Sequence, residues 1–354
     1  MSVFLNSRYK ALVPYTPGEQ PQGKPLIKLN TNESPFPPSE KVLAVLNRTE
    51  GAALRLYPDP TAKGLKEALA STYGVQPENV FAGNGSDEAL NFAFMAFGED
   101  GAAFPDITYG FYQVFAALHG IAADVKPLTK TFQIDIDAYR GAGKLTVLAN
   151  PNAPTGLVLS LAEIEALLKA DPQHVFVVDE AYIDFAAPGT SAIPLTKQYK
   201  NLLVVQTYSK SRSMAGARVG YAIGDAALIQ DLERIRYSTN PYNLNRISLA
   251  AAQAALLDSA YYEENAKKII KTREKTKAAL LKLGFTCTDS QANFLFAAHP
   301  KAEGEALYQA LKDRGILVRH FDKARISAYN RITIGTDEQM EALLLALREI
   351  LGNS

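Results

Sequence analysis

Four short apolar runs, separated by longer helical or irregular stretches, constrain the fold of this chain more than any other feature. They are Leu145–Ala149, Val175–Val178, Leu202–Val205 and Val219–Ile223. Each run is rich in β-branched residues and apolar at successive positions, so both faces of each strand would be buried. The pattern predicts parallel strands in an α/β sheet whose two faces are covered by helices.

The two ends of the chain differ from this central part. Residues 1–45 are rich in proline, which predicts an extended arm rather than a long helix. Residues 246–283 form a long helical pattern that ends at Gly284, and the remainder alternates short strands with two amphipathic helices. We therefore expect a large domain of residues 46–245 and a smaller α+β domain of residues 246–354, completed by the arm.

Charge and composition argue against several classes of function. Lys+Arg and Asp+Glu both total 37, and no basic run stands out, so we expect no nucleic-acid or membrane partner. There is no apolar run of about 18 residues and no segment typical of a signal peptide, which favours a cytoplasmic protein. The four histidines lack the spacing of metal ligands, so no metal site is expected.

Polar motifs follow the carboxyl ends of three of the apolar runs, at the edge where open parallel sheets bind ligands. The first run leads into Asn150–Gly156, the second into Asp179–Tyr182 and the third into Tyr208–Lys210, with Arg218 eight residues later. Taken singly, each has an ordinary explanation as a turn, a cap or a solvated surface group. Together they would bring an amide, an acid, a phenol, an amine and a guanidinium to one edge of one sheet, which indicates a binding site.

In their order and spacing these residues resemble the fold-type I, aspartate-aminotransferase superfamily, and within it the histidinol-phosphate aminotransferase family. The resemblance covers nearly the whole chain, which makes it specific. It implies an α/β large domain with a mostly parallel central sheet flanked by helices, plus a smaller α+β domain. Further matching motifs are Lys28–Pro35, Arg55–Pro60, Thr108–Gly110, Asn240–Asn245 and Arg331–Thr336.

The resemblance implies pyridoxal 5′-phosphate as the cofactor and gives each motif a role. Lys210 would supply the amine that bonds to the cofactor aldehyde and later moves a proton at the substrate Cα. Asp179 would keep the pyridine nitrogen protonated, and Tyr182 would donate to the phenolic oxygen of the ring. Tyr109 would stack on the ring face.

One position departs from the pattern of the superfamily, in which an asparagine usually stands directly before Pro-Thr-Gly. Here Ala153 occupies that position and Asn152 comes one residue earlier, as in part of the histidinol-phosphate subfamily. Either Asn152 reaches the phenolic oxygen, or Tyr182 makes that hydrogen bond alone. We favour Asn152.

The cofactor phosphate needs cations and amide donors. A short apolar strand, Val80–Ala82, leads into a glycine-containing turn and a helix, whose first backbone N–H groups would face the phosphate. The turn alone is a weak signal, because it lacks the spacing of the known phosphate-binding glycine motifs. A guanidinium fork and a hydroxyl would complete the site. The residues expected at the phosphate are Gly85, Ser86, Asp87, Ser209 and Arg218.

The resemblance also implies transamination between L-histidinol phosphate and 2-oxoglutarate in histidine biosynthesis. Arg331 and Arg319 would bind the anionic end of the substrate, with Tyr15 and Asn32 in the same site. The chain would form a homodimer in which Tyr57 reaches the cofactor phosphate of the partner. An aromatic amino-acid aminotransferase or an amino-acid-phosphate decarboxylase on the same scaffold stays open. A DNA-binding regulator built on this fold is disfavoured, because the charge is balanced and about 45 proline-rich residues precede the fold.

Overall fold

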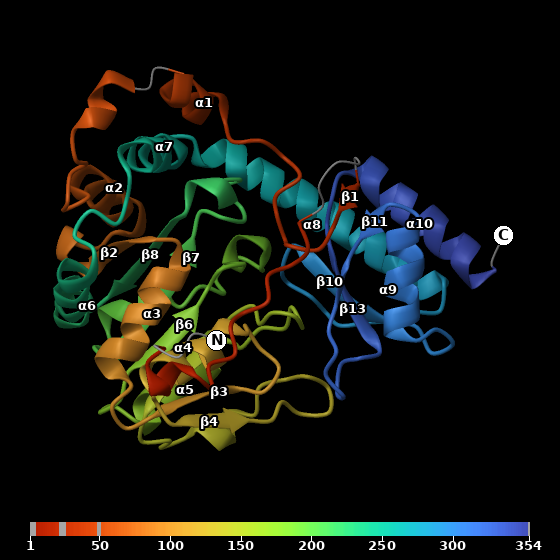
Figure 1. The fold of residues 1–354 in the computed structure, drawn as a ribbon, viewed down its shortest axis with the longest axis horizontal. Helices are drawn as coiled ribbons and strands as arrows, with labels where there is room; N and C mark the ends of the chain where they lie inside the picture. The colour runs from red at the N-terminus through yellow and green to blue at the C-terminus, as the bar shows by residue number, and fades with distance from the viewer. Residues whose placement is uncertain (1–4, 21–25, 48–50, 353–354) are drawn as a thin grey trace.

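The computed structural model describes residues 5–20, 26–47 and 51–352, which form a large and a smaller domain (Figure 1). The α-helices are α1 Glu40–Asn47, α2 Lys63–Tyr73, α3 Ser86–Phe97, α4 Phe111–His119, α5 Leu161–Ala170, α6 Ala226–Thr239, α7 Arg246–Leu256, α8 Ser259–Lys282, α9 Gly304–Asp313 and α10 Asp337–Leu351. Short 3-10 helices are η1 Ser7–Tyr9, η2 Gly51–Arg55, η3 Pro77–Asn79, η4 Ile136–Tyr139, η5 Ile183–Phe185, η6 Ile193–Lys197 and η7 Ala215–Ala217.

The large domain is built on a seven-stranded sheet with the order β2-β8-β7-β6-β5-β3-β4. Its strands are β2 Val80–Asn84, β3 Ala102–Pro105, β4 Ala123–Lys126, β5 Leu145–Ala149, β6 Phe176–Asp179, β7 Leu202–Thr207 and β8 Val219–Gly224. The strands from β7 to β4 pair in parallel, as predicted. The prediction was wrong for the run Val219–Ile223, because β8 is antiparallel to both β2 and β7. Since β5, β6 and β7 remain parallel, their carboxyl ends still meet at one edge.

Helices cover both faces of this sheet, and alternate residues of each strand enter different cores. On β6, Val178 belongs to a cluster with side chains of α2, α5 and α7. Its neighbour Val177 belongs to a second cluster with side chains of α3, α4 and α6. Burial on both faces explains why these strands are apolar at successive positions.

The smaller domain contains an antiparallel sheet with the order β12-β13-β10-β9 and a parallel pair of β1 and β11. The strands are β1 Ile27–Lys28, β9 Thr286–Cys287, β10 Phe294–Ala298, β11 Ile316–Leu317, β12 Arg319–His320 and β13 Tyr329–Thr333. In its core, Phe294 and Ile332 from the sheet pack with Leu280, Leu307 and Leu343 from α8, α9 and α10. The two amphipathic helices predicted near the carboxyl end are confirmed as α9 and α10.

The N-terminal segment runs from the large domain to the smaller one (Figure 1). Near its start, Arg8 donates to the carbonyl oxygen of Leu118 at 3.1 Å. Further along, Glu19 pairs with Lys312 on α9 at 2.8 Å. Much of the segment is extended as predicted, but its end forms α1, which packs against α7. Within the described residues, no helix is both long and apolar enough to cross a membrane.

The helical pattern of residues 246–283 is divided into two helices, α7 and α8, which the sequence did not indicate. Leu257, 75% exposed, lies at the break. Helix α7 packs into the core of the large sheet through Leu249, whereas α8 extends into the smaller domain (Figure 1). The predicted boundaries at residues 45 and 245 stay proposals, and the packing of α7 favours a boundary near residue 257.

Candidate active site

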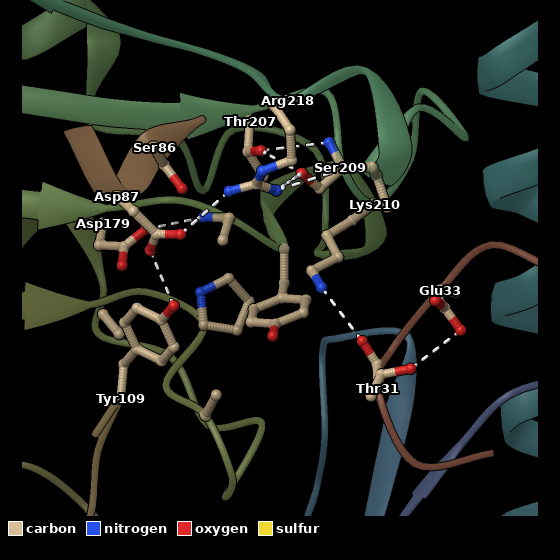
Figure 2. A pocket seen from close by; sticks show the side chains of 16 residues that line it. Thr31, Glu33, Ser86, Asp87, Tyr109, Asp179, Thr207, Ser209, Lys210 and Arg218 are labelled. Carbon is tan, nitrogen blue, oxygen red and sulfur yellow. Dashed lines mark hydrogen bonds and ion pairs between the residues drawn. The ribbon is translucent and has the colours of Figure 1, made fainter. Parts of the chain in front are cut away.

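A cavity of about 170 Å³ lies where the carboxyl ends of β5, β6 and β7 meet the N-terminal segment (Figure 2). Side chains from the strand ends converge there, as expected for the edge of a parallel sheet. Most residues predicted for the cofactor line this cavity: Ser86, Asp87, Tyr109, Asp179, Tyr182, Ser209, Lys210 and Arg218.

Lys210 follows β7, and its side chain points across the cavity toward the N-terminal segment (Figure 2). Its Nζ donates to the carbonyl oxygen of Thr31 at 3.2 Å and lies 5.7 Å from the ring centre of Tyr182. Burial lowers the pKa of Lys210 to about 8, and the charge of Arg331 acts in the same direction. An amine with this pKa is partly neutral at physiological pH, as a nucleophile or a base must be.

Asp179 is the last residue of β6 and is 4% exposed. The hydroxyl of Tyr112 donates to its Oδ2 at 2.7 Å, and the backbone N–H of Ala181 donates to its Oδ1 at 3.3 Å. Burial raises the pKa of Asp179 to about 6, although the Tyr112 hydrogen bond opposes the rise. At neutral pH the side chain is therefore mostly a carboxylate, which suits a protonated ring nitrogen.

Asn32 acts on the cavity through Tyr182. Its Nδ2 donates to the Tyr182 hydroxyl oxygen at 3.0 Å, and its Oδ1 accepts from Thr333 at 2.9 Å. Asn32 is buried and adopts a φ of 55°, in the left-handed region that asparagine tolerates. Because Tyr182 accepts the bond from Asn32, its own hydrogen stays available to a group in the cavity. A direct contact between Asn32 and the substrate stays a prediction.

The geometry of Asn152 corrects our preference for this residue as the donor to the phenolic oxygen. Its Nδ2 donates to the carbonyl oxygen of Ile107 and to the hydroxyl of Thr155, both at 3.0 Å. Its Oδ1 accepts from Thr108 at 2.8 Å. Both amide hydrogens are thus taken within the protein, which favours Tyr182 as the donor to the phenolic oxygen. Asn152 instead fixes the loop that leads to Tyr109.

The corner predicted for the phosphate combines a helix N-terminus with an arginine (Figure 2). Helix α3 begins at Ser86, directly after Gly85 with a φ of 76°. A Cβ at Gly85 would lie 2.5 Å from Nη2 of Arg218, and a Cβ at Gly220 would lie 2.2 Å from the backbone nitrogen of Ser86. Arg218 also donates to the hydroxyl of Ser209 at 3.4 Å. Free N–H groups, a guanidinium and a hydroxyl together form an anion site.

The Asp87 side chain has a role that the sequence did not reveal. Its carboxylate pairs with Nη2 of Arg218 at 3.1 Å and accepts from the hydroxyl of Tyr109 at 2.8 Å. Burial raises the pKa of Tyr109, so this hydroxyl keeps its proton and remains a donor. One carboxylate thus positions both the arginine at the phosphate corner and the tyrosine predicted to stack on the ring.

Arg331 lies on β13, close enough to Lys210 to lower the pKa of that amine. Its Nη2 donates to the carbonyl oxygen of Asn30 at 2.9 Å, while its Nε is buried without a hydrogen-bond partner. Among the described residues, no carboxylate pairs with this guanidinium. A partly buried cation with an unsatisfied N–H group is suited to an anionic ligand.

Arg319 and Tyr15 lie near Arg331. Arg319 on β12 lies opposite Arg331 on the neighbouring strand β13. Its guanidinium donates to the carbonyl oxygens of Thr16 at 3.3 Å and Pro17 at 3.4 Å. The ring of Tyr15 packs edge-on against Tyr109, with ring centres 6.1 Å apart. Burial raises the pKa of Tyr15, while the charges of Arg331 and Arg319 oppose the rise. The structure thus brings together the three side chains predicted for the substrate anion.

Tyr57 is far less buried than the other predicted site residues. It is 77% exposed, and its ring stacks on Tyr242 with ring centres 4.4 Å apart. It does not line the cavity of its own chain. Its predicted contact, with the cofactor of a partner chain, stays a prediction.

Several residues of the cavity were not identified from the sequence. Thr31 and Glu33 line it, although both lie within the matching motif Lys28–Pro35. Thr207 lines it as well and directly precedes the lysine motif. Tyr112, which acts on the cavity through its hydrogen bond to Asp179, belonged to no motif in the sequence.

The donor set fits pyridoxal 5′-phosphate. Lys210 suits the aldehyde, Asp179 the ring nitrogen and Tyr182 the phenolic oxygen. The N-terminus of α3 and Arg218 suit the phosphate, and a Cβ at Gly85 would displace the Arg218 guanidinium. Each polar group of the cofactor therefore has a counterpart among the residues that the cavity brings together.

Comparisons with known proteins agree with this fit. Residues 24–347 match the family model described as aminotransferase class I and II. The chain is 48% identical to the histidinol-phosphate aminotransferase of Brachyspira hyodysenteriae, with 100% of both chains covered. It is 51% identical to that of a Marinomonas species, with 99% of this chain and 100% of the relative covered. Among solved structures, histidinol-phosphate aminotransferase from Sinorhizobium meliloti in complex with pyridoxal 5′-phosphate has a TM-score of 0.85 and 28% identity, covering 92% of this chain and 91% of that one.

Proposed function

Because the chain belongs to the class I and II aminotransferase family, and within it to the histidinol-phosphate aminotransferases, we propose that the cavity around Lys210 is its active site. The reaction transfers the amino group of L-histidinol phosphate to 2-oxoglutarate, giving imidazole-acetol phosphate and L-glutamate in histidine biosynthesis. The observation that carries the proposal is the cavity that holds Lys210 and Asp179, with Arg331 bound to the Asn30 carbonyl next to the Thr31 carbonyl that binds Lys210.

Pyridoxal 5′-phosphate, when bound, supplies an aldehyde that bonds to amines and a ring that accepts electrons from the substrate Cα. Lys210 provides the amine that holds this aldehyde and, once displaced by substrate, the base that removes the proton from Cα. Its lowered pKa keeps a sizeable neutral fraction at physiological pH. The Thr31 carbonyl holds the free amine at 3.2 Å and so keeps it in the cavity.

The other residues fix the cofactor and its charges. The Asp179 carboxylate holds a proton on the ring nitrogen, and Tyr112 keeps that carboxylate in place through its hydrogen bond of 2.7 Å. Tyr182 donates its free hydrogen to the phenolic oxygen while Asn32 orients its hydroxyl. At the phosphate, the guanidinium of Arg218 is joined by the Ser209 hydroxyl and the first N–H groups of α3.

The substrate anion is assigned to Arg331, supported by Arg319 and Tyr15. The same guanidinium must bind the phosphate of histidinol phosphate in one half-reaction and a carboxylate of glutamate in the other. A planar fork of N–H donors suits both groups. Of the five N–H groups of Arg331, one Nη2 hydrogen is donated to Asn30, and Nε has no hydrogen-bond partner among the described residues.

We test the reaction with purified holoenzyme, L-histidinol phosphate and 2-oxoglutarate, measuring glutamate release. Because histidinol phosphate has no carboxyl group to lose, CO₂ is measured in a parallel reaction with an amino-acid phosphate that carries one. Glutamate without CO₂ is expected. Release of CO₂ from an amino-acid phosphate would assign the site to the decarboxylase alternative. A higher kcat/KM for phenylalanine or tyrosine than for histidinol phosphate would contradict the substrate while leaving transamination in place.

We further propose a homodimer in the cytoplasm, with Tyr57 reaching the cofactor phosphate of the partner. Tyr57, Leu54, Leu56 and Tyr242 are 77%, 55%, 50% and 40% exposed, respectively. An exposed apolar group of this kind favours a protein interface. The hydroxyl of Tyr57 would then act on a neighbouring active site.

A further inference from the structure

Three carboxylates from the described part of the chain line the cavity, and the proposed function uses two of them. Asp179 serves the ring nitrogen, and Asp87 holds Arg218 and Tyr109. The third, Glu33, comes from the N-terminal segment and lies on the Lys210 side of the cavity, away from the phosphate corner (Figure 2). A carboxylate placed there has no task in holding the cofactor.

Glu33 is held in place as an anion. Lys28 Nζ contacts both carboxylate oxygens, Oε1 at 2.7 Å and Oε2 at 2.6 Å, and the Thr31 hydroxyl donates to Oε2 at 2.9 Å. Although burial raises the pKa of Glu33, these hydrogen bonds lower it below its usual value. The side chain is nevertheless 43% exposed, so part of the carboxylate faces the open space of the site. An ionised carboxylate can accept about four hydrogen bonds, which leaves capacity for a ligand.

The segment from Asn30 to Glu33 contacts Arg331 and then Lys210, and it ends with the carboxylate of Glu33. The carbonyl of Asn30 accepts from Arg331, the carbonyl of Thr31 accepts from Lys210, and Glu33 presents its own carboxylate. Three residue steps span at most about 11 Å. A cation for an anion, an amine for a reacting carbon and a carboxylate therefore lie along one short stretch of chain.

Histidinol phosphate has its own groups in this order. Its phosphate stands on one side of the amine-bearing carbon and its imidazole ring, with an N–H donor, on the other. We propose that Glu33 is a specificity-determining residue whose carboxylate accepts a hydrogen bond from the imidazole N–H of the substrate. The inference rests on the proposed function, because it takes the phosphate to be at Arg331 and Cα at Lys210.

The second half-reaction provides the contrast. Glutamate carries no imidazole, so Glu33 has no ring to bind when glutamate occupies the site. The carboxylate then keeps its pair with Lys28. A substitution of Glu33 should therefore separate the two half-reactions, which a substitution of Arg331 or Lys210 would not.

The experiment measures single-turnover half-reactions of the Glu33→Gln holoenzyme with three amino donors. They are L-histidinol phosphate, its phenyl analogue L-phenylalaninol phosphate, and L-glutamate. Glutamine keeps the shape and removes the charge, so kcat/KM for histidinol phosphate should fall about tenfold or more. The value for the phenyl analogue should stay within about twofold of that of the unmodified enzyme. The value for glutamate should not fall, because its second carboxylate lies on the Glu33 side and the substitution removes a like charge.

Lys28→Met is the matched control, because it breaks the same ion pair and leaves the carboxylate in the cavity. This variant should retain the preference for histidinol phosphate over the phenyl analogue. An equal loss in both variants, or an equal loss for all three donors, would show that the pair is structural and overturn the proposal. If the unmodified enzyme does not convert histidinol phosphate, the proposed function fails and this inference fails with it.

Discussion

Lys210 and Asp179 lie in one cavity, and burial favours the neutral form of each. The pKa of the lysine falls to about 8 and that of the aspartate rises to about 6. At a pH between these values Asp179 is mostly charged, and a fraction of Lys210 is neutral. The same pH interval therefore supports an amine that can react and a carboxylate that can hold a protonated ring.

The lowered pKa of Lys210 predicts how the apoenzyme regains its cofactor. Only the neutral amine attacks an aldehyde, and a lowered pKa means that the neutral form dominates above about pH 8 rather than above the usual value of 10.5. The rate of covalent attachment, followed by cofactor absorbance in a stopped-flow instrument, should rise with pH and level off above about 8.

Arg331→Met should move this midpoint upward, because the guanidinium lowers the pKa of Lys210. A midpoint near 10.5 in the unmodified apoenzyme would contradict the assigned environment of the lysine.

Arg331→Ala should slow both half-reactions by about ten- to a hundredfold, since a charge-assisted contact contributes about 1.5–3 kcal/mol. Arg331→Lys keeps the positive charge but loses the planar fork of N–H donors, so its half-reaction rates should lie between those of Arg331→Ala and the unmodified enzyme. Arg319→Ala is the matched comparison: its guanidinium donates to the carbonyl oxygens of Thr16 and Pro17, so a smaller loss is expected. Half-reaction rates with histidinol phosphate and glutamate provide the measurement. An unchanged rate in Arg331→Ala would remove Arg331 from the substrate site.

Among individual residues, the sequence allowed prediction of those site residues that lie at or just after the carboxyl end of a strand. Lys210 and Asp179 were identifiable because sheet topology fixes where a strand end lies. Asn152 was not, because a loop decides which of two neighbouring residues faces inward, and here Ala153 lines the cavity. The contact between Tyr112 and Asp179 joins residues 67 apart, and no local pattern encodes it.

Among the elements, the contact of β8 with the N-terminus of α3 is the tightest part of the phosphate corner. Gly220→Ala would place a Cβ 2.2 Å from the backbone nitrogen of Ser86 and 2.4 Å from the carbonyl carbon of Gly85. Both atoms are backbone, so α3 must shift. We expect weaker cofactor binding and a free energy of unfolding reduced by about 1–3 kcal/mol.

Gly216→Ala is the control for this change, because a Cβ at Gly216 would meet no atom within 4 Å. Cofactor titration and thermal unfolding of both apoenzymes should show a loss for Gly220→Ala alone. Equal behaviour of the two variants would mean that the corner tolerates a shift of α3.

Two features of the strands and helices could not be predicted from sequence patterns. A strand buried on both faces is apolar at every position whatever its direction, so the antiparallel course of β8 could not be read from Val219–Ile223. The break between α7 and α8 lies in a segment without glycine or proline, the residues that usually mark a helix end. In contrast, α9 and α10 were predictable because their apolar residues recur on one face.

For the whole molecule, we expect a particle of twice the 38.5 kDa chain mass in sedimentation analysis. Leu56→Glu would place a charge in the proposed interface and should shift the protein toward the monomer, with loss of cofactor. Leu345→Glu, at a similarly exposed residue on α10, should leave the mass unchanged.

Tyr57→Phe separates assembly from binding, because it removes a hydroxyl and keeps the ring. This variant should remain a dimer and bind the cofactor more weakly. A fully active monomer would contradict the proposed assembly.

The central claim is that Lys210 is the amine that holds the cofactor, and borohydride trapping tests it most directly. Reduction of the holoenzyme converts the bond between the amine and the aldehyde into one that survives digestion. Peptide mass spectrometry should then find the pyridoxyl group on the peptide that contains Lys210, and Lys210→Ala should bind the cofactor without being labelled or turning over. A label on any other lysine would contradict the account.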